Sequence, residues 1–365
     1  LRGTFNRLSS IPATIGDCRK LEVLELPMNN LEHLPVEVGQ LHELRFLDLG
    51  RVSAAGFDLD GGDQIIITSI RDDDAPIPGN KLSTLPPEIG QLTKLESLEL
   101  SGNQLTDLPT TLGNLAALKQ LSLEGNQLTT LLPEIGGLSS LVKLRLDRNQ
   151  LSSLPKEIGQ LTKLQLLDVA GNKLTALPPE IGSLVQLETL RADENALTNL
   201  PNEMSGLSAL RDADFTANQL TALPAGLGAW QALRSLSLNS NRFSAFPTDL
   251  RLLIKLESLD IGSNPIGVLP AEIGEMTALQ WLSVSRNGLS GLPEELAALT
   301  TLRVLNVGRC GFGKLPEVIG KLKSLRELDM VGNHLTELPT NVFDLDALES
   351  VRLDQNDFAQ LPTEI

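Results

Sequence analysis

The residues from Gly308 to Lys314 spell GxxxxGK, the spacing of a phosphate-binding loop. In such a loop, backbone amides surround the phosphates, the lysine contacts them, and a following Ser or Thr hydroxyl binds Mg²⁺. The residue that follows here is Leu315, so the metal-binding hydroxyl is absent. Cys310 and Leu315 also occupy positions that recur along the chain for packing reasons, as described below. The string therefore predicts no nucleotide site.

The other residues that could do chemistry are scattered. His33, His42 and His334 lie at unrelated places, which gives no support to a metal cluster or an activated nucleophile. The acidic run at 58–63 hints at a calcium loop but lacks the twelve-residue spacing and the closing glutamate. We therefore expect no catalytic residue, no metal and no cofactor, and the chain is predicted not to be an enzyme.

The composition narrows the classes of partner. The chain has 365 residues, 41% of them hydrophobic and only 3% aromatic, which suggests many similar leucine-based packing units. Its net charge of −16 and the absence of a basic stripe argue against binding to nucleic acid. The sequence has no signal peptide, no glycosylation sequon and no apolar run that could span a bilayer, so we expect a cytoplasmic protein without direct membrane insertion.

A 23-residue period runs through the chain. The segment LPPEIGQLTKLESLELSGNQLTDLP at Leu85 returns as LPKEIGQLTKLQLLDVAGNKLTALP at Leu154, three periods later. Prolines keep this register, with Leu132 in one gap, and an asparagine stands six residues before each, with Cys310 as a replacement. The period predicts a single domain over residues 1–365, built from about fifteen units and truncated at both ends.

Each unit reads LxxLxLxxNxLxxLPxxIGxLxx. Its LxLxx part alternates apolar and polar residues and predicts a short strand, and the PxEIG part predicts a turn with a short helical segment. The buried asparagine is expected to bond loop backbone that would otherwise stay unsatisfied. Cys18 and Trp230 occupy a repeated leucine position and are both expected in the core. The predicted fold class is α/β: a curved, horseshoe-shaped solenoid with a parallel inner sheet and short helical or irregular outer segments.

One segment interrupts the period. Joining Arg51 to Asn80 restores the repeat, so residues 52–79 are predicted to form a loop insertion rich in glycine, proline and aspartate. Two interpretations remain: a functional lid, or an intron translated in frame.

The inner face of the sheet is the candidate functional surface. At the fifth position of successive repeats, on neighbouring predicted strands, Arg145, Asp168, Arg191 and Asp214 alternate in sign, about 4.8 Å apart. This pattern fits either a cross-strand charge ladder that keeps the sheet solvated or the footprint of a partner. A second candidate anchor is Trp281 with nearby arginines, because binding energy concentrates in such residues. The candidate contact residues are Arg145, Asp147, Arg148, Asp168, Arg191, Asp193, Glu194, Asp212, Asp214, Trp281, Arg286 and Arg309.

The phrase LPPEIGxLxxLxxLxLxxNxL resembles the intracellular 23-residue class of leucine-rich-repeat proteins. That class includes Shoc-type Ras-signalling scaffolds, plant Ras-group leucine-rich-repeat proteins and Roco repeat domains. The resemblance covers the whole chain except the insertion. It implies a leucine-rich-repeat solenoid that binds a protein on its concave sheet, with a small GTPase, a kinase or a phosphatase as the class of partner.

Two hypotheses for function follow. The first is a protein-interaction scaffold or adaptor in intracellular signal transduction. The alternative is a regulatory or sensor repeat domain of a larger signalling enzyme, such as a GTPase, kinase or ubiquitin ligase. The motif specifies the fold and leaves the partner open, since one fold serves many functions.

Overall fold

A computed structural model describes residues 1–51, 79–338 and 340–360 of the chain. The chain divides into two compact units, residues 1–174 and residues 175–365. The predicted insertion and its acidic run lie outside the described residues, apart from Gly79 at the end of the insertion.

The first unit consists of strands of three residues that alternate with 3-10 helices of five residues. The strands are β1 (Val23–Glu25), β2 (Phe46–Asp48), β3 (Ser97–Glu99), β4 (Gln120–Ser122), β5 (Lys143–Arg145) and β6 (Leu166–Asp168). The 3-10 helices are η1 (Ala13–Asp17), η2 (Val36–Gln40), η3 (Pro87–Gln91), η4 (Thr110–Asn114), η5 (Pro133–Gly137) and η6 (Lys156–Gln160).

The second unit repeats the same alternation. Its strands are β7 (Thr189–Arg191), β8 (Asp212–Asp214), β9 (Ser235–Ser237), β10 (Ser258–Asp260), β11 (Trp281–Ser283), β12 (Val304–Asn306), β13 (Glu327–Asp329) and β14 (Ser350–Arg352). Its 3-10 helices are η7 (Pro179–Ser183), η8 (Asn202–Gly206), η9 (Leu227–Ala229), η10 (Thr248–Leu252), η11 (Ala271–Glu275), η12 (Glu294–Ala298), η13 (Glu317–Lys321) and η14 (Thr340–Asp344).

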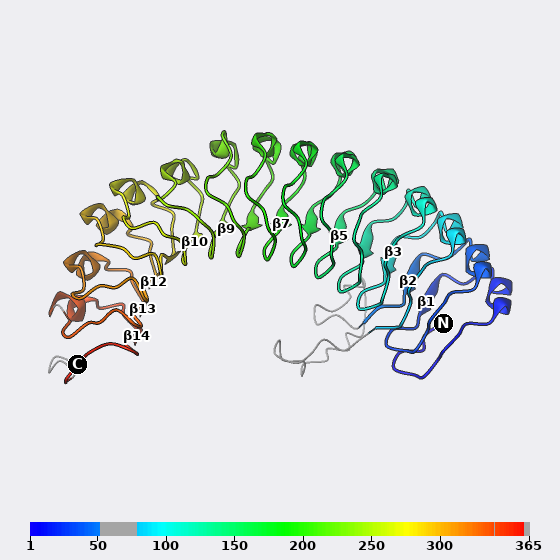
Figure 1. The fold of residues 1–365 in the computed structure, drawn as a ribbon, viewed down its shortest axis with the longest axis horizontal. Coiled ribbons are helices and arrows are strands. Elements are labelled where there is room, and N and C mark those ends of the chain that lie inside the picture. Colours follow the sequence, from blue (N-terminus) through cyan, green and yellow to red (C-terminus); the bar gives the residue numbers. More distant parts are fainter. Residues whose placement is uncertain (52–78, 339, 361–365) are drawn as a thin grey trace. The chain divides into compact units, whose positions relative to one another are not determined.

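Within each unit the strands pair in parallel and in sequence order, each one repeat from the next. Arg145 of β5 lies beside Asp168 of β6, and Trp281 of β11 lies beside Val304 of β12. The 3-10 helices line the opposite side of the same unit (Figure 1). The predicted solenoid with a parallel sheet and short helical outer segments is confirmed in both units.

The 3-10 helices begin after the repeated proline. Pro86 lies in extended backbone at φ −67°, its carbonyl accepts the N–H of Ile89 at 3.0 Å, and the carbonyl of Ile89 accepts that of Leu92 at 3.2 Å. These i to i+3 bonds define a 3-10 turn, which suits a segment that must reverse direction within five residues. Proline fits this entry because its ring fixes φ near this value.

The leucine columns form the core between sheet and turns. Leu95, Leu98 and Leu100 of one repeat are each 0% exposed, as are their counterparts in most other repeats. Each buried leucine side chain contributes roughly 2 kcal/mol of hydrophobic stabilisation. Every repeat therefore gains its stability from contact with the repeats beside it.

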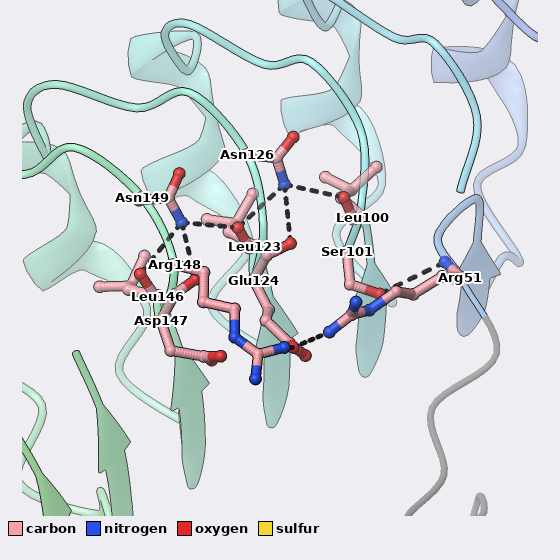
Figure 2. A network of polar contacts seen from close by, with 10 residues as sticks. All are labelled: Arg51, Leu100, Ser101, Leu123, Glu124, Asn126, Leu146, Asp147, Arg148 and Asn149. Carbon is pink, nitrogen blue, oxygen red and sulfur yellow. Dashed lines mark hydrogen bonds and ion pairs between the residues drawn. The ribbon is translucent and has the colours of Figure 1, made fainter. Parts of the chain in front are cut away.

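The recurring asparagine bonds the backbone of its own loop and of the preceding repeat, as expected. The side-chain amide of Asn126 donates to the carbonyls of Leu100 and Leu123 at 3.0 and 2.9 Å, and its Oδ1 accepts the N–H of Leu105 at 3.0 Å. Figure 2 shows the donor side of this pattern at Asn126 and Asn149. Buried asparagines follow it along both units, which leaves few loop groups unpaired.

Cys310 reproduces only part of that pattern. Its Sγ lies 3.3 Å from the carbonyl oxygen of Val284. The equivalent contact one repeat earlier joins the side-chain amide of Asn287 to the carbonyl oxygen of Ile261 at 3.0 Å. The thiol has no counterpart of the amide oxygen, which in regular repeats accepts a backbone N–H of the preceding repeat. The sulfur instead takes weak hydrogen bonds from backbone N–H groups, including that of Leu289, because sulfur is a poorer acceptor than an amide oxygen. Cys310 therefore takes over the donor side of the asparagine and replaces its acceptor oxygen with sulfur.

The two other residues predicted in the core behave differently. Trp230 is 0% exposed and its indole N–H donates to the carbonyl of Met204 at 2.7 Å, so its prediction is confirmed. The prediction for Cys18 is wrong, because its side chain is exposed. Cys18 follows η1. The next turn, η2, packs against one side of η1, and no described turn packs against the other side.

The repeat register continues directly across the interruption. Asn80 Oδ1 accepts the N–H of Leu31 at 3.0 Å, and its amide donates to the carbonyls of Leu26 and Leu49 at 2.9 and 2.8 Å. A Cβ added to Gly79 would lie 2.8 Å from the carbonyl carbon of Gly50. The chain therefore leaves the repeat and re-enters it at adjoining points.

We predict that deleting residues 52–79, which joins Arg51 to Asn80, leaves the fold intact. The midpoint of thermal unfolding, followed by circular dichroism, should stay equal or rise, since removal of a long loop lowers the entropy cost of closure by up to about 3 kcal/mol. Asn80→Ala in the deleted chain is the control. It should destabilise by about 1–3 kcal/mol because buried backbone groups lose their partner. A large loss of thermal stability in the deletion alone would contradict the prediction.

We predict that Cys310→Asn stabilises the second unit by about 1 kcal/mol, because an amide oxygen returns to accept the N–H of Leu289. Asn287→Cys, the same exchange in the opposite direction one repeat earlier, should destabilise by a similar amount. Urea unfolding of both variants against the parent chain measures the two changes. An unchanged or lower midpoint for Cys310→Asn would show that the loop does not return to the regular hydrogen-bond pattern.

Candidate functional site

The aspartates predicted to form a charge ladder have a second role in the turns. Asp168 Oδ1 accepts the N–H of Ala170 at 3.1 Å, and Asp214 Oδ1 accepts that of Thr216 at 2.9 Å. The same bond recurs at Asp48, Asp260, Asn306 and Asp329. Such a bond stabilises the turn after the strand, as Asp and Asn commonly do. Part of the predicted contact surface is therefore scaffold.

A ladder of ion pairs lies at the other end of the strands and was missed by the sequence analysis. In the first unit, Glu96 bonds Arg45 and, at 2.6 Å, Lys119. In the second unit, Arg211–Glu188, Arg234–Glu257 and Arg326–Glu349 pair in the same way. The signal was present, since these residues also recur every 23 positions just before each strand. The pairs are largely exposed, so each contributes little to stability.

Four of the predicted contact residues share an unusual backbone position. Arg148, Glu194, Arg286 and Arg309 each precede the repeat position of asparagine, with φ between 53° and 55°. Glycine holds this position in other repeats, at Gly102, Gly125, Gly171 and Gly332. A side chain in this left-handed region costs about 1 kcal/mol, and such strain is common where a residue serves function.

A cluster of charged side chains in the first unit combines these features (Figure 2). Glu124 bonds the guanidinium of Arg51 and lies 3.5 Å from that of Arg148. Arg51 reaches Glu124 from two repeats away, because the intervening Gly102 has no side chain; a Cβ there would lie 3.2 Å from Arg51 Cδ. Burial, then the neighbouring Arg148, lowers the pKa of Arg51, and burial raises the pKa of Asp147.

Two acids lie side by side further along the same sheet. Asp48 of β2 pairs in register with Glu99 of β3. Burial raises the pKa of each to about 7, and for Asp48 the charge of Glu99 adds to this effect. Arg145 and Lys143 partly offset the shift at Glu99. This pair is a consequence of the fold, since burial cannot be seen in the repeat pattern.

The second unit holds the remaining predicted residues. Arg191, Glu194 and Asp212 are exposed, whereas Asp193 and Asp214 are half-buried. These five lie on β7 and β8 and in the turn that follows β7.

The alternative anchor also lies in this unit. Trp281 and its register partner Val304 are both half-buried and form an apolar pair on the strand-bearing face. Arg286 and Arg309 are exposed, and the guanidinium of Arg309 donates to Gln355 Oε1 at 2.9 Å. Trp281 lies on β11, and Arg286 and Arg309 lie in the loops that follow β11 and β12 on neighbouring repeats.

The candidate phosphate loop is explained by packing. Cys310 and Leu315 are 3% and 1% exposed, and Lys314 lies 3.9 Å from Glu337. Within the described ranges, no group of three or more His, Cys, Asp or Glu side chains is arranged to hold a metal ion. Among the same residues, no helix combines the length and apolar content needed to cross a bilayer.

Family models match three stretches of the chain. A model described as a leucine-rich repeat region matches residues 129–239, and two models described as leucine-rich repeats match residues 77–128 and 255–276. A search of curated proteins found no match.

Solved structures show the same likeness over most of the chain. A leucine-rich-repeat protein of Leptospira interrogans is 30% identical, with 96% of this chain and 94% of that one covered and a TM-score of 0.69. The ectodomain of the Arabidopsis thaliana membrane receptor kinase GASSHO1/SCHENGEN3, in complex with CASPARIAN STRIP INTEGRITY FACTOR 2, is 29% identical, with a TM-score of 0.66. That match covers 97% of this chain, which spans only 44% of the receptor chain. An internalin of Listeria monocytogenes is 22% identical, with 96% of this chain and 90% of the internalin chain covered and a TM-score of 0.74. At this identity the likeness shows the fold alone.

We predict that Asp48→Asn stabilises the first unit at pH 8 by about 1–3 kcal/mol and by about half as much at pH 5.5. The native state holds a proton on Asp48 that the unfolded chain has already lost. Its contribution to the unfolding free energy therefore falls as pH rises from the ordinary pKa of 3.8 to about 7, and stays low above that. Asparagine keeps the turn bond to Gly50 and removes the buried charge.

Urea unfolding at the two pH values measures this difference. Asp260→Asn, which has the same turn bond to the N–H of Gly262, controls for the exchange of the acceptor. Equal stabilisation by Asp48→Asn at pH 5.5 and pH 8 would show that its ionisation does not oppose folding.

Proposed function

The chain belongs to the leucine-rich-repeat family, and from this we propose that it is a protein-interaction scaffold or adaptor in intracellular signal transduction. A protein partner binds the strand-bearing face of the repeats. The contact residues are those predicted from the sequence. In the first unit they lie on β5 and β6 and in the turn after β5, and in the second on β7, β8 and β11 and in the turns after β7, β11 and β12. We propose a cytoplasmic location and a partner of the small-GTPase, kinase or phosphatase class, as the 23-residue repeat class implies.

The observation that carries this proposal is the strained position of charged residues at the rim of the sheet. Arg148, Glu194, Arg286 and Arg309 adopt positive φ where other repeats have glycine. Uncharged residues such as Met28, Ala217 and Gln355 adopt positive φ at the same position in further repeats, so the backbone form belongs to the repeat and charge is what distinguishes these four side chains. All four are exposed, which leaves their charges available to a partner.

The charges of the face suit recognition by complementarity. Exposed side chains of both signs, such as Arg191 and Asp212, stand on adjacent strands whose backbone is fixed by the sheet. Charges on a rigid surface govern specificity and association rate more than affinity. The likeness to a receptor ectodomain solved in complex with another protein supports a protein ligand.

A second candidate is a sensor repeat domain of a larger signalling protein. The similarity that favours it is the one to the ectodomain of a receptor kinase, of which this chain spans less than half. In that case the same face binds the ligand, and the output belongs to a domain outside this sequence.

We predict that the double variant Arg145→Glu, Arg191→Glu no longer binds the protein partner. The immobilised chain and its variants would capture proteins from a cell lysate, and quantitative mass spectrometry would compare the captured sets. Lys163→Glu with Lys255→Glu is the matched control, because it changes net charge equally at exposed positions on the turns before β6 and β10. The partner should be lost from the first pair and kept by the second, and its binding should weaken with added salt.

A thermal melt of each variant by circular dichroism separates loss of binding from loss of fold. If the arginine pair folds normally and keeps native affinity while Trp281→Ala does not, the contact surface belongs to the second unit near β11. If the arginine pair, Trp281→Ala and the lysine control all capture the same proteins as the parent chain, the proposed use of this face is wrong.

A further inference from the structure

A hollow of about 670 Å³ lies in the second unit between the loops that follow β10 and β11. Ser263, Asn264, Pro265 and Gly267 line it from the first loop, and Arg286, Asn287 and Gly288 from the second. It is formed by the loops beyond the strand ends, at the rim of the strand-bearing face, and it shares Arg286 with the proposed partner-contact residues.

The hollow opens where two repeats depart from the regular hydrogen-bond pattern. In a regular repeat, the residue after the asparagine donates its N–H to the preceding repeat, as Gln219 does to Leu197 O at 2.9 Å. Pro265 holds that position after β10 and has no N–H. In the next repeat, Gly288 holds it, turns to φ 60° and makes no such bond.

Cys310 contributes to the same departure. The regular loop is also held by the next asparagine, whose Oδ1 accepts an N–H such as that of Leu220 at 2.9 Å. After β11 that oxygen is absent, since a thiol replaces the amide. The loop that contains Gly288 therefore lacks the regular backbone bond and has only a weak sulfur acceptor for Leu289 N–H, although Asn287 O still accepts the N–H of Gly267 at 3.1 Å. A Cβ added to Gly267 or Gly288 would meet nothing within 4 Å, so a ligand can approach the backbone there.

Three hydrogen-bond donors at the hollow have no acceptor within the described part of the chain. Arg286 makes no ion pair and no side-chain hydrogen bond, the hydroxyl of Ser263 is unbonded, and the N–H of Gly288 makes no hydrogen bond. Arg309, at the same position of the next repeat, extends away from the hollow over Gly332 and bonds Gln355 Oε1 at 2.9 Å. The carboxylate of Asp260, on the adjoining strand, already accepts bonds from Gly262 N–H and the amide of Asn239.

A set made of guanidinium, amide N–H and hydroxyl donors selects an anion with several acceptor oxygens. The positive φ of Ser263, Arg286 and Gly288 places these groups on left-handed turns, a backbone form that often cradles phosphate. We propose that this hollow is a binding site for phosphate, either free in solution or carried as phosphoserine on a protein partner. The proposal does not rest on the partner-binding face, because the anion itself is the ligand.

Inorganic phosphate is the first probe, added to the full chain labelled with ¹⁵N-glycine at constant ionic strength. The Gly288 amide, assigned by its loss in Gly288→Ala, should shift and saturate. Arg286→Gln should weaken binding by about tenfold or more, since a bond to a charged donor is lost. Glutamine suits this backbone position, as Gln355 has φ 58° at the same place in its repeat.

Arg148→Gln is the matched control, because it removes an exposed arginine from the same repeat position in the first unit. It should leave the Gly288 titration unchanged, and a thermal melt should show all three chains folded. A shift that rises linearly without saturation, or an equal affinity in the Arg286→Gln variant, would overturn the proposal.

A short phosphoserine peptide and its serine counterpart distinguish the two sources of the anion. Both phosphate and the phosphopeptide should saturate the same Gly288 shift and compete with each other, while the serine peptide should not. Tighter binding of the phosphopeptide identifies a modified protein as the source, and equal affinity identifies free phosphate. Phosphopeptide binding that leaves Gly288 unmoved would refute the site.

Discussion

Each loop that leaves the sheet carries backbone groups that face the interior and cannot pair within their own repeat. The buried asparagine pairs these groups, because one side-chain amide both donates and accepts hydrogen bonds. Asn126 links the carbonyl of Leu100 in the preceding repeat, its own loop at Leu123 and the N–H of Leu105. An unpaired buried donor or acceptor costs about 1–3 kcal/mol, so repeated loss of this contact would exceed the stability of a repeat. Strand register and turn position both depend on it.

Departures from this pattern show where the chain differs from a uniform scaffold. Pro265 and Cys310 each remove one of the bonds that close a loop. The hollow lies between the two affected loops, which follow β10 and β11. The interruption after Arg51 behaves otherwise, because Asn80 restores the full set of bonds where the repeat resumes. Local irregularity in a solenoid can thus be confined to a loop while the sheet continues.

Charge is divided between scaffold and surface by position in the repeat. Acids at the ends of strands, such as Asp168 and Asp214, bond the turn that follows them. Residues just before each strand form ion pairs between neighbouring repeats, as Arg326 and Glu349 do. The charged residues at the positive-φ position have no single structural role. Arg148 contacts Glu124, whereas the side chain of Arg286 has no partner among the described residues. Function is therefore best sought at that position.

The sequence alone determined the period, the strand register, the buried leucine columns and the role of the asparagine, because each repeat has the same neighbours and the same backbone needs. It also identified Trp230 as core and Cys310 as a weaker substitute. The sequence could not determine what depends on contact between side chains of different repeats. Arg51 reaches Glu124 only because Gly102 between them is bare, and Asp48 and Glu99 hold their protons to about pH 7 only because the fold buries them side by side. Cys18 matched the leucine pattern yet is exposed, because burial requires a covering neighbour as well as an apolar position. A periodic pattern specifies what each repeat must satisfy, and the tertiary structure decides which side chains remain free to bind.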